Sequence, residues 1–305
     1  MGIFLGIDGG GSKTSCLIGD EDSILGAGAA AGSNVVRVGE RQAGESLSAA
    51  IRQACTAAKI TPAQIERTCV GIAGAARPEI AGVVRGFVSE IVSGEVEVVG
   101  DMVIAMEAAF GSGPGVIVIA GTGSIAYGRN SAGQIARAGG WGFAISDEGS
   151  GHWIGRSAVA ALMRACDEAG VETTNVLLES IMKSWAVTTR EQLVVAANGN
   201  PAPDFAALLP VLLSASDAGD VTARMVLTQA GVELAGLAKI VIGRIFGNGG
   251  AVPAAVSGGV FSSCEVVRQV FYDSLRAEYP KVLPSPNLVD PAKGALDLAR
   301  KGTRS

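Results

Sequence analysis

The pattern of apolar and polar positions occurs twice along the chain. Residues 4–28 read FLGIDGGGSKTSCLIGDEDSILGAG, and residues 116–140 read VIVIAGTGSIAYGRNSAGQIARAGG. Each segment contains an apolar run, a glycine-rich bend, a second run, a polar turn and a third run, which is typical of strands joined by tight turns. The repeat therefore predicts two lobes, each of which begins with a meander of three strands.

Strand-like and helix-like patterns alternate after each meander. After the first meander, the predicted helices are residues 39–58, 78–92 and 102–110, and the predicted strands are residues 69–73 and 96–99. After the second meander, the predicted helices are residues 150–169, 175–185, 190–197, 205–214, 220–246 and 263–278, and the predicted strand is residues 252–256. Strands that alternate with helices imply a sheet against which the helices pack.

We therefore predict an α/β fold with a duplicated mixed sheet and a cleft between two lobes. The N-terminal lobe is expected to span residues 1–118, and the C-terminal lobe residues 119–290. A last helical pattern follows a proline-rich link at residues 284–287. We expect this C-terminal helix, residues 291–305, to cross back to the first lobe.

The composition of the chain limits the kinds of molecule that we expect it to bind. The 305 residues are 48% apolar, which is enough to fill sizeable cores. The net charge is −5, and the lysines and arginines are scattered rather than gathered into a stripe, so we expect no nucleic-acid partner. The 43 glycines concentrate in short clusters after apolar runs, as they do where strands turn tightly around a ligand.

The chain also carries indications about its compartment. It does not begin like a signal sequence, and no apolar stretch reaches the roughly 18 residues that span a bilayer, so we expect no membrane partner. Five cysteines lie far apart, and their odd number favours a reducing cytoplasm. His152 is the only histidine, which excludes zinc motifs that need two.

The first glycine-rich bend is a candidate phosphate site. Residues 6–14 read GIDGGGSKT, which is not a P-loop because strand-like residues follow Lys13 rather than a helix. A glycine bend between strands can still point several backbone N–H groups at phosphate oxygens. Asp8, at the end of the strand, is placed to hold the water shell of Mg²⁺. The alternative is a plain tight turn in which Asp8 is a capping residue.

The second bend, residues 120–124 (AGTGS), repeats this arrangement. Gly121, Gly123 and Ala126 formally match a dinucleotide fingerprint, but that fingerprint must open a helix, and residues 124–129 alternate as a strand does. Two matching bends, one in each lobe, are expected to hold a triphosphate from both sides. Ala120 occupies the position of Asp8 in the repeat, so we assign the metal to the first lobe.

Asp101 is the candidate base. It follows Gly100 at the end of an apolar strand and the start of a helix. The alternative is an ordinary N-cap. Phosphoryl transfer, however, requires a carboxylate that accepts the proton of the attacking hydroxyl, together with amides and Mg²⁺ that neutralise the moving charge. A strand-end aspartate facing a cleft suits the first task.

The segment GGWGFAISDEGSGHWIG, residues 139–155, is a candidate sugar site. Trp141 offers a flat apolar face to a sugar ring, and Asp147 and Glu148 can accept sugar hydroxyls or lie near the metal. Both tryptophans can equally be core anchors, and for Trp153 we prefer this interpretation. We expect His152 to be structural.

Two further loops are candidates. Residues 257–263 (SGGVFSS) end a strand and begin a helix, and their glycines allow close approach of a flat adenine. Asn34 is a loop amide that fits a turn or a sugar hydroxyl equally well.

The motifs DGGGSKT, IAGTGS, GGWGFAISDEGSGHWIG and SGGV, with Gly100-Asp101 between the first two, occur in the order of the BadF-type ATPase family. The chain resembles that family over essentially its whole length and, within it, the N-acetylglucosamine kinases. The resemblance implies the two-lobed actin/hexokinase (ribonuclease H-like) fold, ATP with Mg²⁺, lobes that close on the sugar, and transfer to its 6-hydroxyl. We also expect a homodimer in the cytoplasm.

The resemblance also implies roles for single residues. Asp101 matches the catalytic base. The positions that match the amino-sugar site are Asn34, Thr122, Trp141, Gly142 and Asp147. The positions assigned to the nucleotide are Gly10, Gly11, Ser12, Lys13, Thr14, Gly123, Ser124, Gly258 and Gly259.

Several activities remain open within this resemblance. The same family includes glucosamine kinases, muramic-sugar kinases and ATPases that activate 2-hydroxyacyl-CoA dehydratases through an iron–sulfur cluster. The GGWG sequence favours an N-acetyl sugar, and the scattered cysteines disfavour a shared cluster. A sugar sensor without catalysis is a third class, which the presence of Asp8 and Asp101 disfavours.

Overall fold

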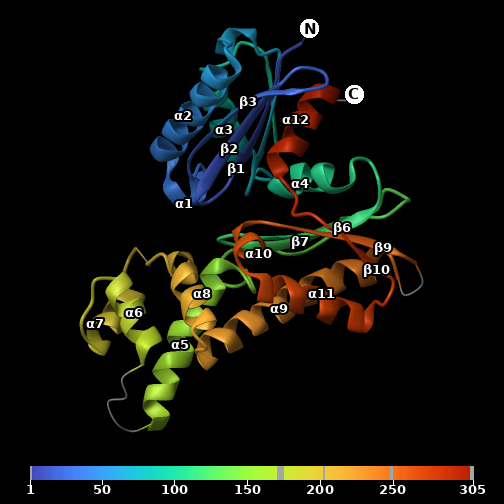
Figure 1. Ribbon diagram of the computed structural model, residues 1–305. Helices are drawn as coiled ribbons and strands as arrows, with labels where there is room; N and C mark the ends of the chain where they lie inside the picture. The colour runs from blue at the N-terminus through green and yellow to red at the C-terminus, as the bar shows by residue number, and fades with distance from the viewer. Residues whose placement is uncertain (1, 170–174, 202, 248–249, 303–305) are drawn as a thin grey trace.

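The computed structural model describes residues 2–169, 175–201, 203–247 and 250–302. The chain forms two lobes, each built on one sheet, and the C-terminal segment returns from the second lobe to the first (Figure 1). The last three residues of the expected C-terminal helix, 303–305, lie outside the described residues.

The first sheet contains five strands in the order β3-β2-β1-β4-β5. The strands are β1 (Phe4–Gly9), β2 (Lys13–Gly19), β3 (Ile24–Ala31), β4 (Arg67–Ile72) and β5 (Glu95–Val99). The first three strands are antiparallel, while β4 and β5 add in parallel beside β1. Parallel addition brings the carboxyl ends of β1, β4 and β5 to the same edge of the sheet, where Asp8 and Asp101 lie.

The second sheet repeats the first, with the order β10-β9-β6-β7-β8. Its strands are β6 (Gly115–Ala120), β7 (Ser124–Arg129), β8 (Ile135–Gly139), β9 (Val252–Ser257) and β10 (Val282–Pro284). The predicted duplication of a mixed sheet is confirmed. The boundary expected between residues 118 and 119 falls inside β6, which belongs wholly to this sheet.

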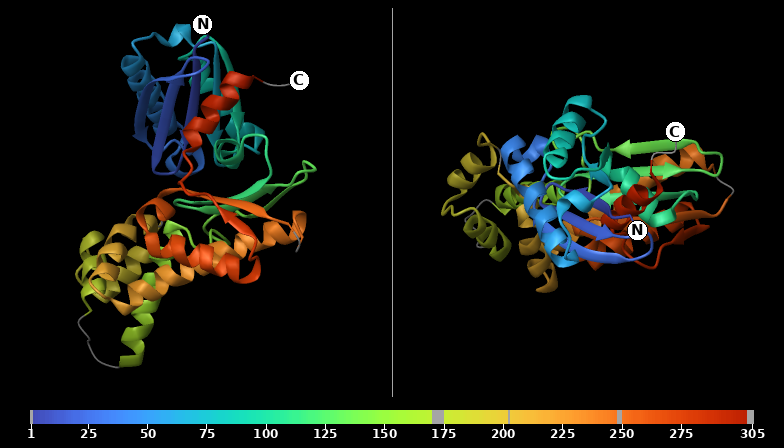
Figure 2. Two further views of the ribbon diagram at one scale, coloured as in Figure 1. Left: turned by 45° about the vertical axis from the view of Figure 1, so that its right-hand side comes forward. Right: turned by 90° about the horizontal axis from the view of Figure 1, so that it is seen from above.

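Helices cover both faces of the first sheet. On one face, α2 (Glu40–Ala58) and α3 (Pro78–Ser89) pack on Leu5, Ile7 and Ile18, and the short helices α1 (Val35–Val38) and η1 (Pro62–Gln64) flank α2. On the other face, α4 (Asp101–Phe110) and α12 (Pro291–Lys301) pack on Phe4 and Cys69. The expected return of the C-terminal helix is therefore observed (Figure 2).

The second lobe is richer in helix. Its helices are α5 (Gly151–Ala169), α6 (Val176–Ser184), α7 (Arg190–Ala197), η2 (Phe205–Leu208), α8 (Leu209–Asp217), α9 (Val221–Ile245), α10 (Gly259–Ser263) and α11 (Glu265–Glu278). Most of them share one core with one face of the second sheet. Cys264 is extended and separates α10 from α11, whereas the sequence pattern predicted one helix from residue 263.

The expectation of no bilayer-length apolar stretch was wrong for α9. Among the described residues, this one helix is long and apolar enough to cross a membrane by length and composition. Over half of its most apolar window, 56%, is buried inside the structure, where Ala230, Leu234 and Val241 belong to the core of the second lobe. The packing of α9 between the second sheet and α11 therefore accounts for its composition.

The two lobes meet around α4. This helix contributes Ala105 and Met106 to a small core with Ile117 and Ala255 of the second sheet, while Ile104 packs into the first lobe. The chain passes to the second lobe after α4 and comes back through α12. These two helices therefore decide how the two sheets are placed relative to each other.

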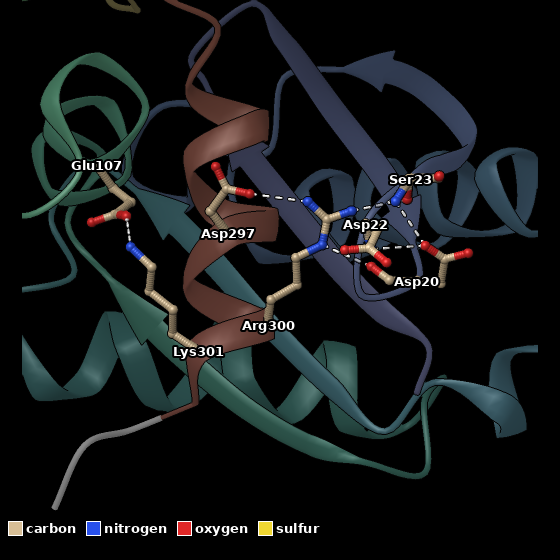
Figure 3. A network of polar contacts seen from close by, with 7 residues as sticks. All are labelled: Asp20, Asp22, Ser23, Glu107, Asp297, Arg300 and Lys301. Atoms are coloured by element: carbon tan, nitrogen blue, oxygen red, sulfur yellow. Dashed lines mark hydrogen bonds and ion pairs between the residues drawn. The ribbon is translucent and has the colours of Figure 1, made fainter. Parts of the chain in front are cut away.

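Polar contacts hold α12 on the first lobe (Figure 3). Arg300 donates from Nε to the carbonyl of Asp20 at 2.7 Å, from Nη2 to that of Ser23 at 2.9 Å, and from Nη1 to Asp297 Oδ1 at 3.0 Å. Lys301 forms an ion pair with Glu107 of α4. The guanidinium thus fixes the end of α12 to the turn between β2 and β3.

Helix α12 also crosses α4 at very close range. A Cβ atom added at Gly294 would collide with the carbonyl oxygen of Ile104 and would lie 2.7 Å from the backbone nitrogen of Ala108. Both obstacles are backbone atoms, which cannot rotate away as a side chain can. Glycine is therefore required at this crossing.

We expect Gly294→Ala to lower the free energy of unfolding by about 2 kcal/mol or more, because the added methyl group forces the two helices apart. The same substitution at Gly86 is the matched control, since nothing lies within 4 Å of a Cβ there. Gly86→Ala should instead raise stability by about 0.4–1 kcal/mol through the unfolded state. Urea denaturation followed by circular dichroism measures both changes; equal effects of the two variants would contradict the close crossing.

Candidate active site

The two glycine bends meet between the lobes. Each bend is closed by a backbone hydrogen bond of 2.9 Å: the N–H of Gly10 donates to Lys13 O three residues on, and the N–H of Gly121 donates to Gly123 O two residues on. Between the bends, the hydroxyls of Ser12 and Thr122 are 3.1 Å apart and share a hydrogen bond. The expectation that the bends face each other is therefore confirmed.

The first bend is supported from behind by buried hydroxyls. The Thr14 hydroxyl donates to Ala31 O at 2.7 Å and lies 2.8 Å from the hydroxyl of Ser33. The N–H groups of Ser33 and Asn34 both donate to Gly10 O. The side chain of Asn34 caps α1 by accepting from the Val36 N–H at 3.1 Å. In the structure, Thr14 and Asn34 thus hold the bend and the loop after β3 in place.

The second bend is supported by the loop before α5. Asp147 is only 8% exposed and has a positive φ of 66°, and its Oδ1 accepts from the Ser124 N–H at 3.3 Å. A Cβ at Gly123 would lie 2.9 Å from Asp147 Oδ2, so glycine allows the carboxylate to approach the bend. The Ser124 hydroxyl donates to Glu148 O at 2.7 Å. Ser124 and Asp147 therefore position the bend from inside the second lobe.

The electrostatics of Asp147 agree with this buried position. Burial raises its pKa above the ordinary value, and the neighbouring Glu148 charge adds to the rise, while N–H donors from Ser124 and Gly142 oppose it. The raised pKa means that Asp147 takes up a proton at a higher pH than an exposed aspartate does. The backbone N–H donors oppose this, because they favour the charged form.

Three carboxylates gather where the first lobe faces the second. Burial raises the pKa of Asp8 to about 7, and the charges of Asp101 and Asp290 add to the rise, while Lys13 opposes it. Burial also raises the pKa of Asp101, although the Met102 N–H donates to its Oδ1 at 2.9 Å. Asp101 is the first residue of α4 after the N-cap Gly100, and its carboxylate accepts an N–H of the first turn of that helix.

Sequence reasoning missed Asp290. This residue caps α12 by accepting from the Ala292 N–H at 3.2 Å, and the chain before it is held by Val289 O, which accepts from Ser257 Oγ at 3.1 Å. The pair Asp290-Pro291 is a recognisable helix start. Its place beside Asp8 depends on the return of the chain to the first lobe, which no local pattern reveals.

The aromatic residues of the loop at 140–148 divide into two groups. Trp141 is 64% exposed, and the guanidinium of Arg137 lies 4.1 Å from the centre of its ring. Next to it, Gly142 has a φ of +96° with open space around its Cα. Phe143 instead stacks 5.0 Å from His152, whose ring also contacts Phe205.

The second group consists of rings that pack on one another around His152. Burial lowers the pKa of His152, and the charges of Arg156 and Arg37 lower it further. Its ring belongs to an aromatic cluster with Phe205, which in turn contacts Trp185 at 5.2 Å. Trp153 packs against the core of the second lobe, as we expected.

The third glycine turn lies at the end of β9. Gly258 has a φ of +99°, and a Cβ there would strike the backbone of Ala120 at the end of β6. Gly259, by contrast, is open and begins α10. A cavity of about 340 Å³ lies next to this helix, with Leu213, Leu227, Asp217 and Ser263 in its lining. A volume of this order accommodates a small planar ligand.

The carboxylates also fit a water-bearing cation. Among the described residues, no group of three His, Cys, Asp or Glu side chains is arranged to hold a metal by itself. Mg²⁺ keeps several of its waters and takes one or two carboxylates together with phosphate oxygens. The like-charge repulsion that raises the pKa of Asp8 is the environment that a divalent cation would relieve.

Two curated relatives match almost the entire chain. An N-acetylmuramic acid/N-acetylglucosamine kinase of Clostridium acetobutylicum is 32% identical over 304 residues, with 98% of this chain and 99% of the relative covered. An N-acetyl-D-glucosamine kinase of Dictyostelium discoideum is 28% identical, with 97% of each chain covered.

Solved structures share the fold. A protein from Chromobacterium violaceum superposes with a TM-score of 0.75 at 24% identity, covering 97% of this chain and 98% of that one. A ROK family glucokinase from Streptomyces griseus, solved with glucose and AMPPNP, gives a TM-score of 0.62 at 19% identity and covers 99% and 100%. The expected two-lobed actin-like ATPase fold is therefore confirmed. Residues 5–299 match the BadF/BadG/BcrA/BcrD ATPase family, and the chain belongs to that family.

Proposed function

We propose that this protein is an ATP-dependent kinase that transfers the γ-phosphoryl group to the 6-hydroxyl of an amino sugar, with N-acetylglucosamine as the first candidate. The observation that carries this proposal is the contact of the two glycine bends at Ser12 and Thr122, with Asp8 and Asp101 at strand ends on the same side of the first lobe. The backbone N–H groups of the two bends are proposed to bind the phosphates beside this contact.

The nucleotide is proposed to run from the bends to the second lobe. The phosphates lie at the bends, and the adenine enters the cavity beside α10, where Leu213 and Val266 offer apolar contact and Asp217 can accept from an amino group. Gly258 supports this path, because only a residue without a side chain allows β9 to end so close to β6.

Asp8 fits the role of Mg²⁺ holder in this arrangement. When bound, the cation would neutralise charge on the β- and γ-phosphates. Asp8 would hold it through water, and Asp290 adds negative charge that favours a cation at this position. Lys13 is close enough to Asp8 to lower its pKa and so adds a positive charge at the foot of the first bend.

Asp101 is proposed to accept the proton of the sugar hydroxyl. Asp101 follows β5 as the first residue of α4, and burial raises its pKa, which makes it a stronger base than an exposed aspartate. The oxygen of the sugar then forms the new bond to phosphorus, while the bond to the bridging oxygen of ADP breaks.

The sugar assignment depends on the relatives and on one loop. Both curated relatives are named as kinases of N-acetylated amino sugars. Trp141 and Gly142 lie on an exposed loop of the second lobe, and the Trp141 ring is available for stacking once Arg137 moves aside. N-acetylmuramate and glucosamine are the alternative acceptors.

An ATPase that activates a dehydratase is a weaker candidate. Such an activator needs cysteine thiolates that hold a cluster between subunits. Here all five cysteines are buried, and burial raises the pKa of Cys16, Cys55, Cys69 and Cys264. Buried thiols with raised pKa values are poor cluster ligands.

The function is tested by coupled ADP release with N-acetylglucosamine, N-acetylmuramate, glucosamine and glucose as acceptors. We expect at least one N-acetylated amino sugar to stimulate ATP turnover, and mass spectrometry should find its 6-phosphate. If none of the four sugars stimulates turnover, the proposed function is wrong.

Asp101→Asn tests the base. The amide can still accept the N–H of Met102 but cannot take a proton, so kcat should fall about 100-fold or more while KM for the sugar changes only a few-fold. Asp22→Asn is the matched control, because Asp22 is exposed in the turn between β2 and β3, at the opposite end of the sheet. An unchanged kcat for Asp101→Asn would show that the residue serves only the helix.

Asp8→Asn tests how much the charged Asp8 carboxylate lowers the free energy of unfolding. The folded protein holds the pKa of Asp8 at about 7, above its ordinary 3.8, so the charged carboxylate destabilises the metal-free fold at pH 8. At pH 8, the free energy of unfolding of Asp8→Asn should therefore exceed that of the wild type by at most about 4 kcal/mol.

This gain should shrink as the pH falls from 7 towards 4, because the wild-type carboxylate then takes up its proton. Urea titrations at several pH values, without nucleotide or metal, measure the difference. Asp22→Asn should change stability by less than about 0.5 kcal/mol throughout. A gain that is independent of pH would contradict the raised pKa.

A further inference from the structure

An ion pair joins the two lobes beside the glycine bends. Arg37 lies on α1 of the first lobe, and Asp204 caps η2 of the second lobe by accepting from the Ala206 N–H. The Nη2 atom of Arg37 is 2.8 Å from Oδ2 of Asp204, and the two side chains are 28% and 50% exposed. Neither residue was singled out in the sequence.

The same arginine reaches the tip of the first bend. A Cβ at Gly11 would lie 3.2 Å from Arg37 Cδ, 3.5 Å from Arg37 Nη1 and 3.3 Å from Thr122 Oγ1. The Cα of Gly11 is therefore closely flanked by the Arg37 side chain on one side and by Thr122 of the second bend on the other. A group that approaches the backbone at this point would contact both.

A positively charged side chain at this position would offset the negative charge that surrounds it. The cleft already holds the negative charges of Asp8, Asp101 and Asp290, and the nucleotide adds more. Phosphoryl transfer is accelerated chiefly by cations and N–H donors aimed at the moving group. The planar guanidinium can donate two hydrogen bonds to one phosphate, just as it does to one carboxylate.

We propose that Arg37 binds the phosphoryl group during its transfer and that the ion pair with Asp204 is only the contact that Arg37 makes when no substrate is bound. The proposal rests on the kinase function proposed above. Arg37 is not consumed: the sugar oxygen forms its bond to phosphorus, the bond to the ADP oxygen breaks, the proton goes to Asp101, and the guanidinium only exchanges the Asp204 carboxylate for phosphoryl oxygens.

A simple latch between the lobes makes a different prediction. If the ion pair only keeps the lobes together, removing either partner breaks it, and the two variants should behave alike. Partly exposed ion pairs of this kind contribute about 0–1 kcal/mol, so a latch would change kinetics by about fivefold at most. If Arg37 contacts the phosphoryl group, only the removal of Arg37 should lower kcat strongly.

The test compares Arg37→Ala, Arg37→Lys, Asp204→Asn and Arg156→Ala in the ADP-release assay with the accepted sugar. Arg156 is the matched control because it is an exposed arginine whose charge acts on His152, as that of Arg37 does. Circular dichroism verifies that each variant is folded, which we expect because Arg37 lies on a four-residue surface helix.

We expect Arg37→Ala to lower kcat by about 100-fold or more, with KM for ATP and sugar within about threefold. Arg37→Lys should recover part of kcat, and added guanidinium ion at non-denaturing concentration should partly rescue Arg37→Ala but not Asp101→Asn. Asp204→Asn and Arg156→Ala should keep kcat within about threefold of wild type.

Equal losses in Arg37→Ala and Asp204→Asn would overturn the proposal in favour of a latch. A wild-type kcat in Arg37→Ala would overturn it outright. Either result leaves the kinase function intact, since the wild-type enzyme and Asp101→Asn report on that function separately. A wild-type protein without turnover on any sugar would instead remove the proposed function and this inference together.

Discussion

The hydrogen bond between Ser12 and Thr122 joins two bends that belong to separately folded sheets. It forms only if both sheets are placed correctly, and that placement depends on α4 and α12. Helix α4 packs on both sheets, and α12 crosses it where Gly294 leaves no room for a side chain. The helix crossing thus sets the positions of the two sheets, and the two bends meet as a consequence.

Negative charge collects at one edge of the first sheet. Parallel addition of β4 and β5 brings Asp8 and Asp101 to one edge, and the return of the chain adds Asp290 beside them. Burial and this repulsion together raise the pKa of Asp8 and destabilise its charged form. Under the proposed function, a cation held beside these carboxylates would relieve the repulsion.

Much of the fold follows from local pattern. Strand alternation, glycine bends and helical periodicity in residues 4–28 and 116–140 predicted the duplicated sheet, because each signal depends on neighbouring residues only. The order of motifs also indicated the family, which the match over residues 5–299 confirmed. The apolar length of α9 went unrecognised, since its apolar positions are interrupted by single polar residues that the helix tolerates at its surface.

The sequence by itself predicted that Asp8 and Asp101 lie beside glycines near the ends of strands. It also showed that the two glycine-rich bends resemble each other. Only the tertiary structure decided which side chains meet. It turned Thr14, Ser124 and Asp147 inward as supports, brought Asp290 to Asp8 and paired Arg37 with Asp204. The physical reason is the separation of the interacting residues along the chain. A strand or a turn is fixed by contacts within a few residues, whereas an interaction between charges on distant segments forms only after the chain has folded back on itself.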